Sequence, residues 1–301
     1  MTEEPSKAVV IDTGSGYCKA GVAGDETPAC CFPTLYAHDP SSENPHLVGK
    51  DALEAMNRLQ VIRPVQRGRY LDWGTLEHIW QYCFLDQLKV DSTEHPVLTT
   101  FYPDENKQDK ENMALVFFET FTVPGYYTMS SSVLCLYASG KSTGLVLDSG
   151  EDITSIIPVI DGCSIAHCHI LQNFGSRDIN RYLLRILNNP LLNEETARLI
   201  KEKRGYIFGS EEELLNSEAL PMPFDLPDGQ QIQIFGEASK AAESIFDPMK
   251  LGSTEMGVAH MVSECAFKVD AENRKELLSH IVLAGGNTLY KNFSTRYHNI
   301  I

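Results

Sequence analysis

The chain has 301 residues and a formal net charge of −16, from 25 lysines and arginines against 41 aspartates and glutamates. This acidic balance offers no basic surface to neutralise nucleic-acid phosphates, so we expect no direct nucleic-acid partner. The longest apolar runs, such as 113–118 and 133–138, are far shorter than the about 20 residues of a spanning helix, so no membrane partner is expected. Eight cysteines, most of them single residues in apolar stretches, favour free thiols in a reducing compartment.

A strand, a glycine loop and a second strand are predicted near the start of the chain. Residues 7–11 form a short apolar run that leads into Asp12-Thr-Gly-Ser-Gly16, and 17–22 continue as a second apolar stretch. The same pattern returns at 144–150, followed by 153–160. Such a repeat is typical of a duplicated domain.

The repeat also sets the predicted domain organisation. Asp12 and Asp148 are 148 − 12 = 136 residues apart. We therefore expect two related lobes that share a cleft. The first covers residues 1–140 with a small insertion at about 34–71, and the second covers 141–301.

Helical patterns lie between and after the two strand–loop–strand segments. Apolar residues recur at helical spacing and predict helices over 75–89, 107–121, 179–187, 194–204 and 255–267. Ser176 or Asp178 is expected to cap the third of these helices, and Leu226-Pro-Asp-Gly229 is typical of a hairpin turn. Strands and helices interleave throughout, which predicts an α/β protein.

The first loop has the residues of a phosphate-binding turn. Gly14 and Gly16 allow the backbone to approach a ligand, and the Ser15 hydroxyl and nearby backbone N–H groups could hold phosphate oxygens. Lys19 could place a positive charge on the terminal phosphates, and Asp12 could orient waters around Mg²⁺. Taken alone, a Gly-Ser-Gly sequence is more often a plain turn, and a single lysine is usually a solvated surface residue.

A third glycine loop follows another apolar strand at 280–284. Gly285 and Gly286 allow close approach of an adenosine or an α-phosphate, and Tyr290 offers a flat apolar face. Three such loops, two of them carrying an aspartate, favour a nucleotide cleft between duplicated halves. Three unrelated turns are the alternative on pattern alone.

Several longer segments accompany these loops. They include Asp72-Trp73, His95-Pro-Val-Leu98, Phe118-Glu-Thr-Phe121, Leu136-Tyr-Ala-Ser-Gly140 and Ile200-Lys-Glu-Lys203. In type and order they resemble actin and the actin-related proteins. The resemblance implies the actin fold, with two ribonuclease-H-like lobes around a cleft for ATP or ADP with Mg²⁺. Sugar kinases and heat-shock-type chaperones share the duplicated loop pattern but lack segments of this kind.

The same resemblance implies a set of ligand-contacting residues. Those that match phosphate-loop positions are Gly14, Ser15, Gly16, Lys19 and Gly150. Those that match positions around the adenosine are Lys201, Glu202, Gly286, Asn287, Leu289 and Tyr290. Those that match positions near the metal are Asp12 and Asp148.

The sequence departs from the family pattern at positions that matter for hydrolysis. In the second loop Glu151-Asp152 replaces the family's Asp-Gly, which places a Cβ and a carboxylate where the backbone should approach phosphate. Ser131 and Ser155 stand at positions that match a glutamine and a histidine near the attacking water. Because water positioning is most of what such an enzyme contributes, we expect very slow hydrolysis or none, and we assign no catalytic residue.

Filament formation is also expected to be impaired. The segment 34–71 is shorter than in the family, at the position of a subunit-contacting loop, and Asp39–Pro45 is typical of a solvated loop. The family continues beyond Ile301, through elements that complete the first lobe and carry a lysine against the adenine. A truncated or alternatively terminated product with an exposed apolar patch is therefore a further hypothesis.

Together these features favour an actin-related structural or cytoskeletal protein that binds ATP or ADP with little or no hydrolysis. We expect it in the cytoplasm and cytoskeleton, with the nucleus as the alternative, and in contact with cytoskeletal or complex-forming proteins. The alternative function is a polymerising, ATP-hydrolysing actin-like protein, for which Asp12, Lys19 and Asp148 are the favourable evidence.

Overall fold

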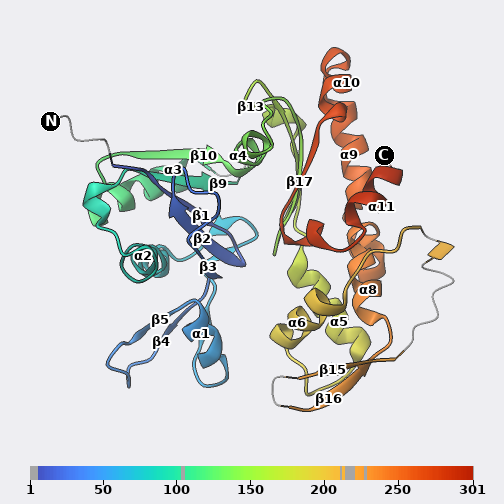
Figure 1. The fold of residues 1–301 in the computed structure, drawn as a ribbon, viewed down its shortest axis with the longest axis horizontal. Coiled ribbons are helices and arrows are strands. Elements are labelled where there is room, and N and C mark those ends of the chain that lie inside the picture. The colour runs from blue at the N-terminus through green and yellow to red at the C-terminus, as the bar shows by residue number, and fades with distance from the viewer. Residues whose placement is uncertain (1–5, 103–105, 211, 214–220, 227–228, 301) are drawn as a thin grey trace. The chain divides into compact units, whose positions relative to one another are not determined.

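The computed structural model describes residues 6–102, 106–210, 212–213, 221–226 and 229–300. The chain forms two compact units, residues 1–134 and 135–301, and each is an α/β structure that is described by itself (Figure 1). All eight cysteines are free thiols. No helix in the ranges given above is long and apolar enough to cross a membrane.

A five-stranded sheet forms the centre of the first unit. Its order is β10-β9-β1-β2-β3, in which β1 runs antiparallel to β2 and parallel to β9. The strands are β1 (Val9–Thr13), β2 (Tyr17–Val22), β3 (Cys30–Pro33), β9 (Val97–Phe101) and β10 (Tyr126–Ser130). The first predicted strand–loop–strand segment is thus confirmed.

Two helices pack their apolar side chains on this sheet. α2 (Trp73–Tyr82) continues as a π-helical turn over Cys83–Leu88, and α3 (Lys107–Leu115) continues as another over Val116–Thr120. These bounds agree with the two helices predicted from the apolar spacing. Asp72 caps α2, because its Oδ1 accepts a hydrogen bond from Thr75 N at 3.0 Å. The buried core shared by the helices and the sheet includes Val9, Ile11, Leu76, Ile79, Trp80 and Phe117.

The segment predicted as an insertion has a small fold of its own. A three-stranded sheet of β4 (Tyr36–His38), β5 (His46–Val48) and β6 (Val61–Ile62) is joined by α1 (Lys50–Glu54) and a 3-10 turn at Ala55–Asn57. Leu35, Ala37 and Ala52 form its buried cluster. The remaining short elements of the first unit are β7 (Val65–Gln66), β8 (Arg69–Tyr70) and a 3-10 turn at Ser92–Glu94.

The expectation of a plain solvated loop over Asp39–Pro45 is wrong at its first residue. Asp39 is buried, accepts a hydrogen bond from Ser41 Oγ at 2.6 Å and pairs with Arg58 Nη1 at 2.7 Å. The hydrogen bonds from Ser41, and then Arg58, lower the pKa of Asp39. Residues 40–44 are exposed, so the loop is solvated but tethered at its start.

The second unit repeats the design of the first. Its sheet order is β13-β12-β11-β17 with β14 beside β12, and β11 runs antiparallel to β12 and parallel to β17. Asp148 lies opposite Ser155 in this hairpin, as Asp12 lies opposite Lys19 in the first, so the 136-residue repeat holds on both strands. The strands are β11 (Gly144–Ser149), β12 (Thr154–Ile160), β13 (Cys163–Ser164), β14 (Ile170–Gln172) and β17 (Ile281–Ala284).

The second sheet and the helices of this unit share one apolar core. The core includes Leu147, Ile156, Ile179, Ile200, Met261 and Phe293. The helices are α5 (Ser176–Leu187), α6 (Glu194–Arg204), α8 (Glu237–Ala242), α9 (Val258–Lys268), α10 (Ala271–Ser279) and α11 (Phe293–Ile300). Short 3-10 turns lie at Ala166–Cys168, Glu243–Ile245, Pro248–Leu251 and Gly286–Leu289, and α4 (Ser131–Ala138) spans the division between the units.

Two local predictions in the second unit have different outcomes. The expected cap of α5 is wrong, because the helix begins after Gly175, and Asp178 instead accepts a hydrogen bond from Gly175 N at 3.0 Å. The predicted hairpin is present as antiparallel β15 (Met222–Asp225) and β16 (Gln231–Ile234). Pro227 and Asp228 of its turn lie outside the described residues.

Aromatic rings stack where α2 meets the small sheet of the first unit. The rings of His46 and His78 lie 4.1 Å apart between centres, and those of Tyr36 and His78 lie 5.1 Å apart. The Tyr36 hydroxyl is 2.7 Å from His46 Nδ1, and His38 lies 5.6 Å from His46, ring to ring. Burial, and then the charge of His46, lower the pKa of His78.

We expect the first unit to lose stability as the pH falls below about 6.5, the ordinary pKa of histidine. The pKa of His78 is lower in the folded state, so its contribution to stability is complete above the unfolded pKa and is lost as the pH falls toward the folded one. Asp72 and Glu77 oppose this shift without reversing it. Urea unfolding followed by tryptophan fluorescence measures the stability of the first unit at each pH, because both tryptophans of the chain, Trp73 and Trp80, lie in α2.

The matched variants for this experiment are His78→Gln and His260→Gln. The first should flatten the pH dependence between about pH 5 and 7. The second changes an exposed histidine of the other unit and should leave the dependence as in the parent. An unchanged slope in His78→Gln would contradict the assignment.

Candidate functional site

The first loop brings its charged residues together. The Asp12 carboxylate accepts hydrogen bonds from Lys19 Nζ at 2.9 Å and from Thr100 Oγ1 at 2.6 Å. Asp12 and Lys19 meet because the register of β1 and β2 places them directly opposite each other. Their side chains stay 37% and 46% exposed, so both can also reach a ligand. A solvated carboxylate of this kind suits Mg²⁺, which keeps several waters when it binds.

The turn of the first loop is closed by backbone bonds. Gly14 N donates to Tyr17 O at 3.0 Å, and Gly16 O accepts from Thr34 N at 2.9 Å. The Ser15 hydroxyl is buried, and no other residue that the structure describes offers it a hydrogen bond. A buried hydroxyl without a partner fits a loop that hydrogen-bonds a ligand such as a phosphate oxygen.

The second and third loops pack directly on each other within the second unit. Asn287 Nδ2 donates to Ser149 Oγ at 3.1 Å and to Gly150 O at 2.9 Å. Gly285 has φ +84°, and a Cβ there would lie 2.3 Å from Ser149 O and 2.5 Å from Asp148 Oδ1. The structure therefore assembles Asp148, Gly150, Gly285 and Asn287, four residues that the sequence singled out separately.

Lys201 is the buried member of the predicted adenosine group. It is 3% exposed, and its Nζ contacts Ser176 Oγ at the start of α5. Burial lowers the pKa of Lys201 to about 8, against the opposing effect of Glu151 and then Glu202. The ammonium is thus held inside the unit on the side that faces the second loop.

The other predicted adenosine residues lie at different depths. The Tyr290 ring packs on Gly205, where a Cβ would lie 2.8 Å from Cε1, and burial raises the pKa of Tyr290. Glu202 is exposed and accepts a hydrogen bond from Arg198 Nη1 at 2.9 Å. Gly286 and Leu289 are also exposed, so the buried Lys201 and the half-buried Tyr290 contrast with an open rim.

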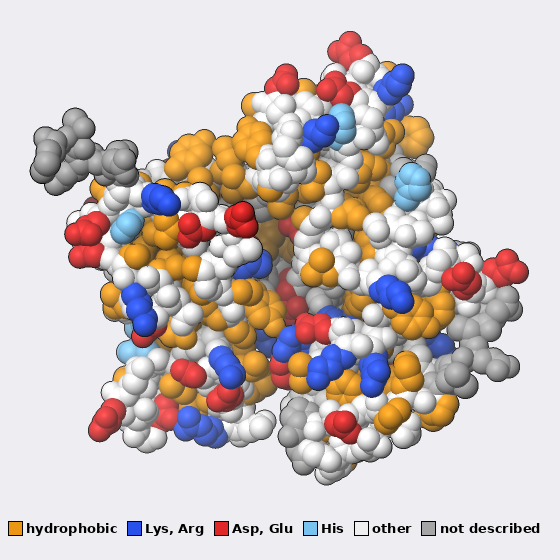
Figure 2. Space-filling model, viewed as in Figure 1, with side chains coloured by type: hydrophobic (Ala, Val, Ile, Leu, Met, Phe, Trp, Pro, Cys, Tyr) orange, Lys and Arg blue, Asp and Glu red, His pale blue; other side chains and the backbone are white. Residues whose placement is uncertain are grey.

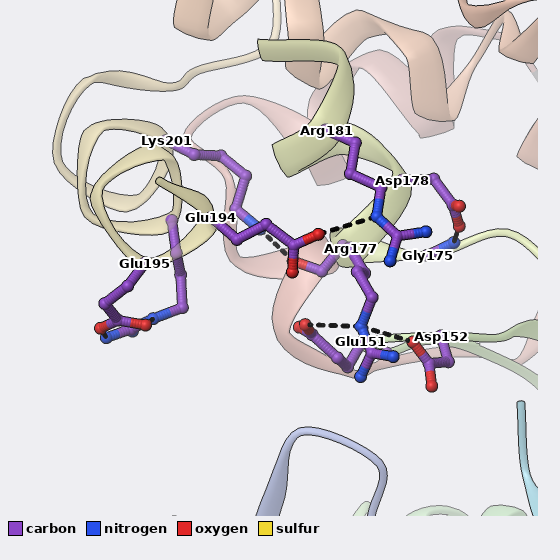
Figure 3. A network of polar contacts seen from close by, with 12 residues as sticks. Glu151, Asp152, Gly175, Arg177, Asp178, Arg181, Glu194, Glu195 and Lys201 are labelled. Carbon is purple, nitrogen blue, oxygen red and sulfur yellow. Dashed lines mark hydrogen bonds and ion pairs between the residues drawn. The ribbon is translucent and has the colours of Figure 1, made fainter. Parts of the chain in front are cut away.

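An arginine that sequence reasoning missed stands behind the second loop. Arg177 Nε lies 3.2 Å from Asp152 Oδ1 and 3.7 Å from Glu151 Oε1, and Figure 3 shows the guanidinium between the two carboxylates. Backbone bonds close the same contact, because Ser176 N donates to Gly150 O at 3.0 Å and Arg177 N to Glu151 O at 2.9 Å. The signal that could have found it is an arginine in the first turn of a helix, a position that ordinarily favours acids.

The two serines at the predicted water-positioning sites lie in different units. Ser131 begins α4 in the first unit, and Ser155 is a buried residue of β12 in the second. Ser155 stands opposite Asp148, where the first unit has Lys19 opposite Asp12. A serine hydroxyl has neither the reach of glutamine nor the basicity of histidine.

Each unit has an antiparallel hairpin with a glycine loop, and a third strand that runs parallel to the first strand of that hairpin. This repeated arrangement defines a duplicated α/β protein of the actin-like class. The family model described as "Actin" matches residues 3–207 and 190–300. The chain is also 35% identical over 316 residues to Actin-related protein 2 of Acanthamoeba castellanii, which covers 98% of this chain and 81% of that protein. The chain belongs to the actin family, as a divergent actin-related protein.

Replacing Gly285 should destabilise the second unit, whereas replacing its neighbour should not. Gly285→Ala forces a Cβ into Ser149 O at a positive φ, which costs roughly 1–3 kcal/mol in free energy of unfolding. Gly286→Ala meets no atom within 4 Å and should change that free energy by less than about 0.5 kcal/mol. Chemical denaturation of both variants measures the difference, and equal stabilities would refute the close packing of the two loops.

Arg177 and Arg181, one helical turn apart, provide a second matched pair. Arg177→Met leaves buried Asp152 without its cation and should cost about 3–5 kcal/mol in unfolding free energy. Arg181 is 59% exposed and pairs with Glu194 at 2.8 Å, so Arg181→Met should cost less than about 1 kcal/mol (Figure 3). Denaturation curves monitored by circular dichroism would contradict this if the two variants were equally stable.

Proposed function

We propose that this protein is a structural, actin-related component of a protein assembly that binds an adenine ligand without turning it over efficiently. The observation that carries the proposal is the packing of Gly285 and Asn287 on Asp148 and Gly150, because it retains a preformed loop pair of the kind that approaches nucleotides. The buried Ser15 hydroxyl, which has no hydrogen-bond partner among the described residues, supports the same assignment in the first unit.

In this proposal each predicted residue has a defined task. Lys19 and the backbone of the first loop bind phosphate oxygens, and the buried Lys201 and half-buried Tyr290 position the nucleoside. Asp12 in the first unit and Asp148 in the second each offer a carboxylate that suits Mg²⁺ with its retained waters. The metal, when bound, neutralises part of the phosphate charge.

Weak hydrolysis follows from the side chains near the reacting end. Ser131 and Ser155 offer only short hydroxyls where a water must be oriented, and Glu151 and Asp152 bring negative charge to the second loop. Positioning and charge stabilisation supply nearly all of the rate in phosphoryl transfer. The ligand therefore acts as a structural component of the fold.

Protein partners are the expected counterpart of a net charge of −16. Acidic and basic side chains are interspersed on the face drawn in Figure 2. A mixed charged surface favours specific protein contacts over attraction to polyanions. We expect the protein in the cytoplasm and cytoskeleton, with the nucleus as the alternative, in contact with cytoskeletal or complex-forming proteins.

A polymerising ATPase is the second candidate function. The Asp12–Lys19 pair and Asp148 favour it, because these charged groups suit a triphosphate with Mg²⁺. Sedimentation with ATP and Mg²⁺ separates the two functions. Pelleting above a critical concentration, together with phosphate release, would overturn the structural assignment.

An adenine ligand should stabilise the purified protein without being consumed. At a hundredfold excess over Kd, the most tightly bound of adenosine, ADP and ATP should raise Tm by about 5 °C. A phosphate-release assay with ATP and Mg²⁺ should stay at the level of a protein-free control. The nucleotide-binding part of the proposal fails if none of the three ligands changes Tm, and the structural part fails if phosphate release follows sustained turnover.

A further inference from the structure

Two buried cations lie beside the second loop, and the chain supplies acids for both. Arg177 is 8% exposed, and Asp152, its nearest carboxylate, is fully buried. Lys201 is 3% exposed, and Glu151 is the first of the neighbouring charges that favour its protonated form. Figure 3 shows Glu151 and Asp152 on either side of Arg177, with Lys201 on the adjoining helix.

The covalent arrangement keeps these groups together. Ser176 contacts Lys201 through its hydroxyl, and Arg177 is the next residue along α5. The N–H groups of both residues donate to carbonyls of the second loop, Gly150 O and Glu151 O. The loop, the start of α5 and the Lys201 ammonium therefore form one rigid polar cluster within the second unit.

The acids of this cluster outnumber the cation that they contact. Both carboxylates pair with Arg177, so a phosphate that approached the second loop would meet more negative charge than this one cation neutralises. Like charges within a few ångströms in a partly desolvated site repel strongly. A neutral nucleoside brings no such charge, and its binding depends on apolar and hydrogen-bonding contacts instead.

We propose that Glu151 and Asp152 are specificity-determining residues that act as a built-in anion at the second loop and select a nucleoside with few or no phosphates over a nucleoside triphosphate. This inference rests on the proposed adenine site and names its ligand class. Arg177 holds the two acids in place. The negative charge at the second loop is thereby supplied by the chain's own carboxylates instead of by a ligand phosphate.

The full-length protein itself provides the first test. Isothermal titration with adenosine, ADP and ATP, each in the presence of Mg²⁺, should give an adenosine affinity about tenfold or more above that of ATP, with ADP between them. An ATP affinity equal to or above that of adenosine overturns the inference. Binding of none of the three contradicts the proposed adenine site itself, so the two failures are distinguishable.

Charge-neutralising variants provide the second test. Glu151→Gln keeps the shape of a side chain that is 18% exposed, and should raise ADP affinity about tenfold while leaving adenosine affinity unchanged. Glu276→Gln removes the same charge from an exposed position of α10 and should change neither affinity. An ADP-to-adenosine affinity ratio that stays the same in Glu151→Gln overturns the assignment.

Asp152→Asn is the companion variant, and its fold must be checked because it leaves Arg177 buried with less compensating charge. If it retains the circular dichroism spectrum of the parent, it should shift the same ratio in the same direction as Glu151→Gln. A shift in the opposite direction overturns the inference. If Asp152→Asn does not fold, the inference is tested by two other results. These are the order of the three ligand affinities in the parent and the ADP-to-adenosine affinity ratio in Glu151→Gln.

Discussion

The register of two antiparallel hairpins is the constraint on which the rest of this structure depends. In each unit an aspartate is the next-to-last residue of the first strand, a glycine loop follows the strand, and the residue seven positions after the aspartate lies directly opposite it. A one-residue slip would turn every side chain of the strand to the other face, so the register is fixed by the buried core. The same backbone therefore presents Lys19 in one unit and Ser155 in the other. That difference gives the first loop a lysine from its own hairpin, whereas the cations beside the second loop come from helices.

Charge burial is the feature that separates the second loop from a plain phosphate-binding turn. Moving Arg177 and Asp152 out of water has a large desolvation cost that their mutual attraction only partly offsets. Such a pair is weak evidence for stability and better evidence for specificity. Here it fixes the start of α5 against the loop, because the backbone N–H of Arg177 donates to Glu151 O in the same contact. Side-chain charge and backbone geometry thus favour one closed conformation of the loop.

Local signals allowed much of the fold to be predicted. Helix α6 has its predicted bounds, because Asn193 caps it through Thr196 N at 2.9 Å and the apolar spacing is regular. The departure at Glu151-Asp152 was also visible in the sequence, but the partner of these acids was not. Arg177 lies 177 − 152 = 25 residues from Asp152, and no helical or strand period connects them. Burial of Asp39 was missed for the same reason, since its cation comes from a separate turn at Arg58.

A bound ligand can stabilise an actin-related protein without acting as a switch. Any molecule that binds only the folded state adds stability in proportion to the logarithm of its concentration over Kd, whether or not it is ever hydrolysed. A switch additionally requires that two ligand states bind two conformations differently. If Glu151 and Asp152 take the place of a phosphate, removing the terminal phosphate changes little at the second loop, and the free energy available for switching falls. On this proposal, a family member with this loop is better suited to a fixed position in an assembly than to a cycle of polymerisation driven by hydrolysis.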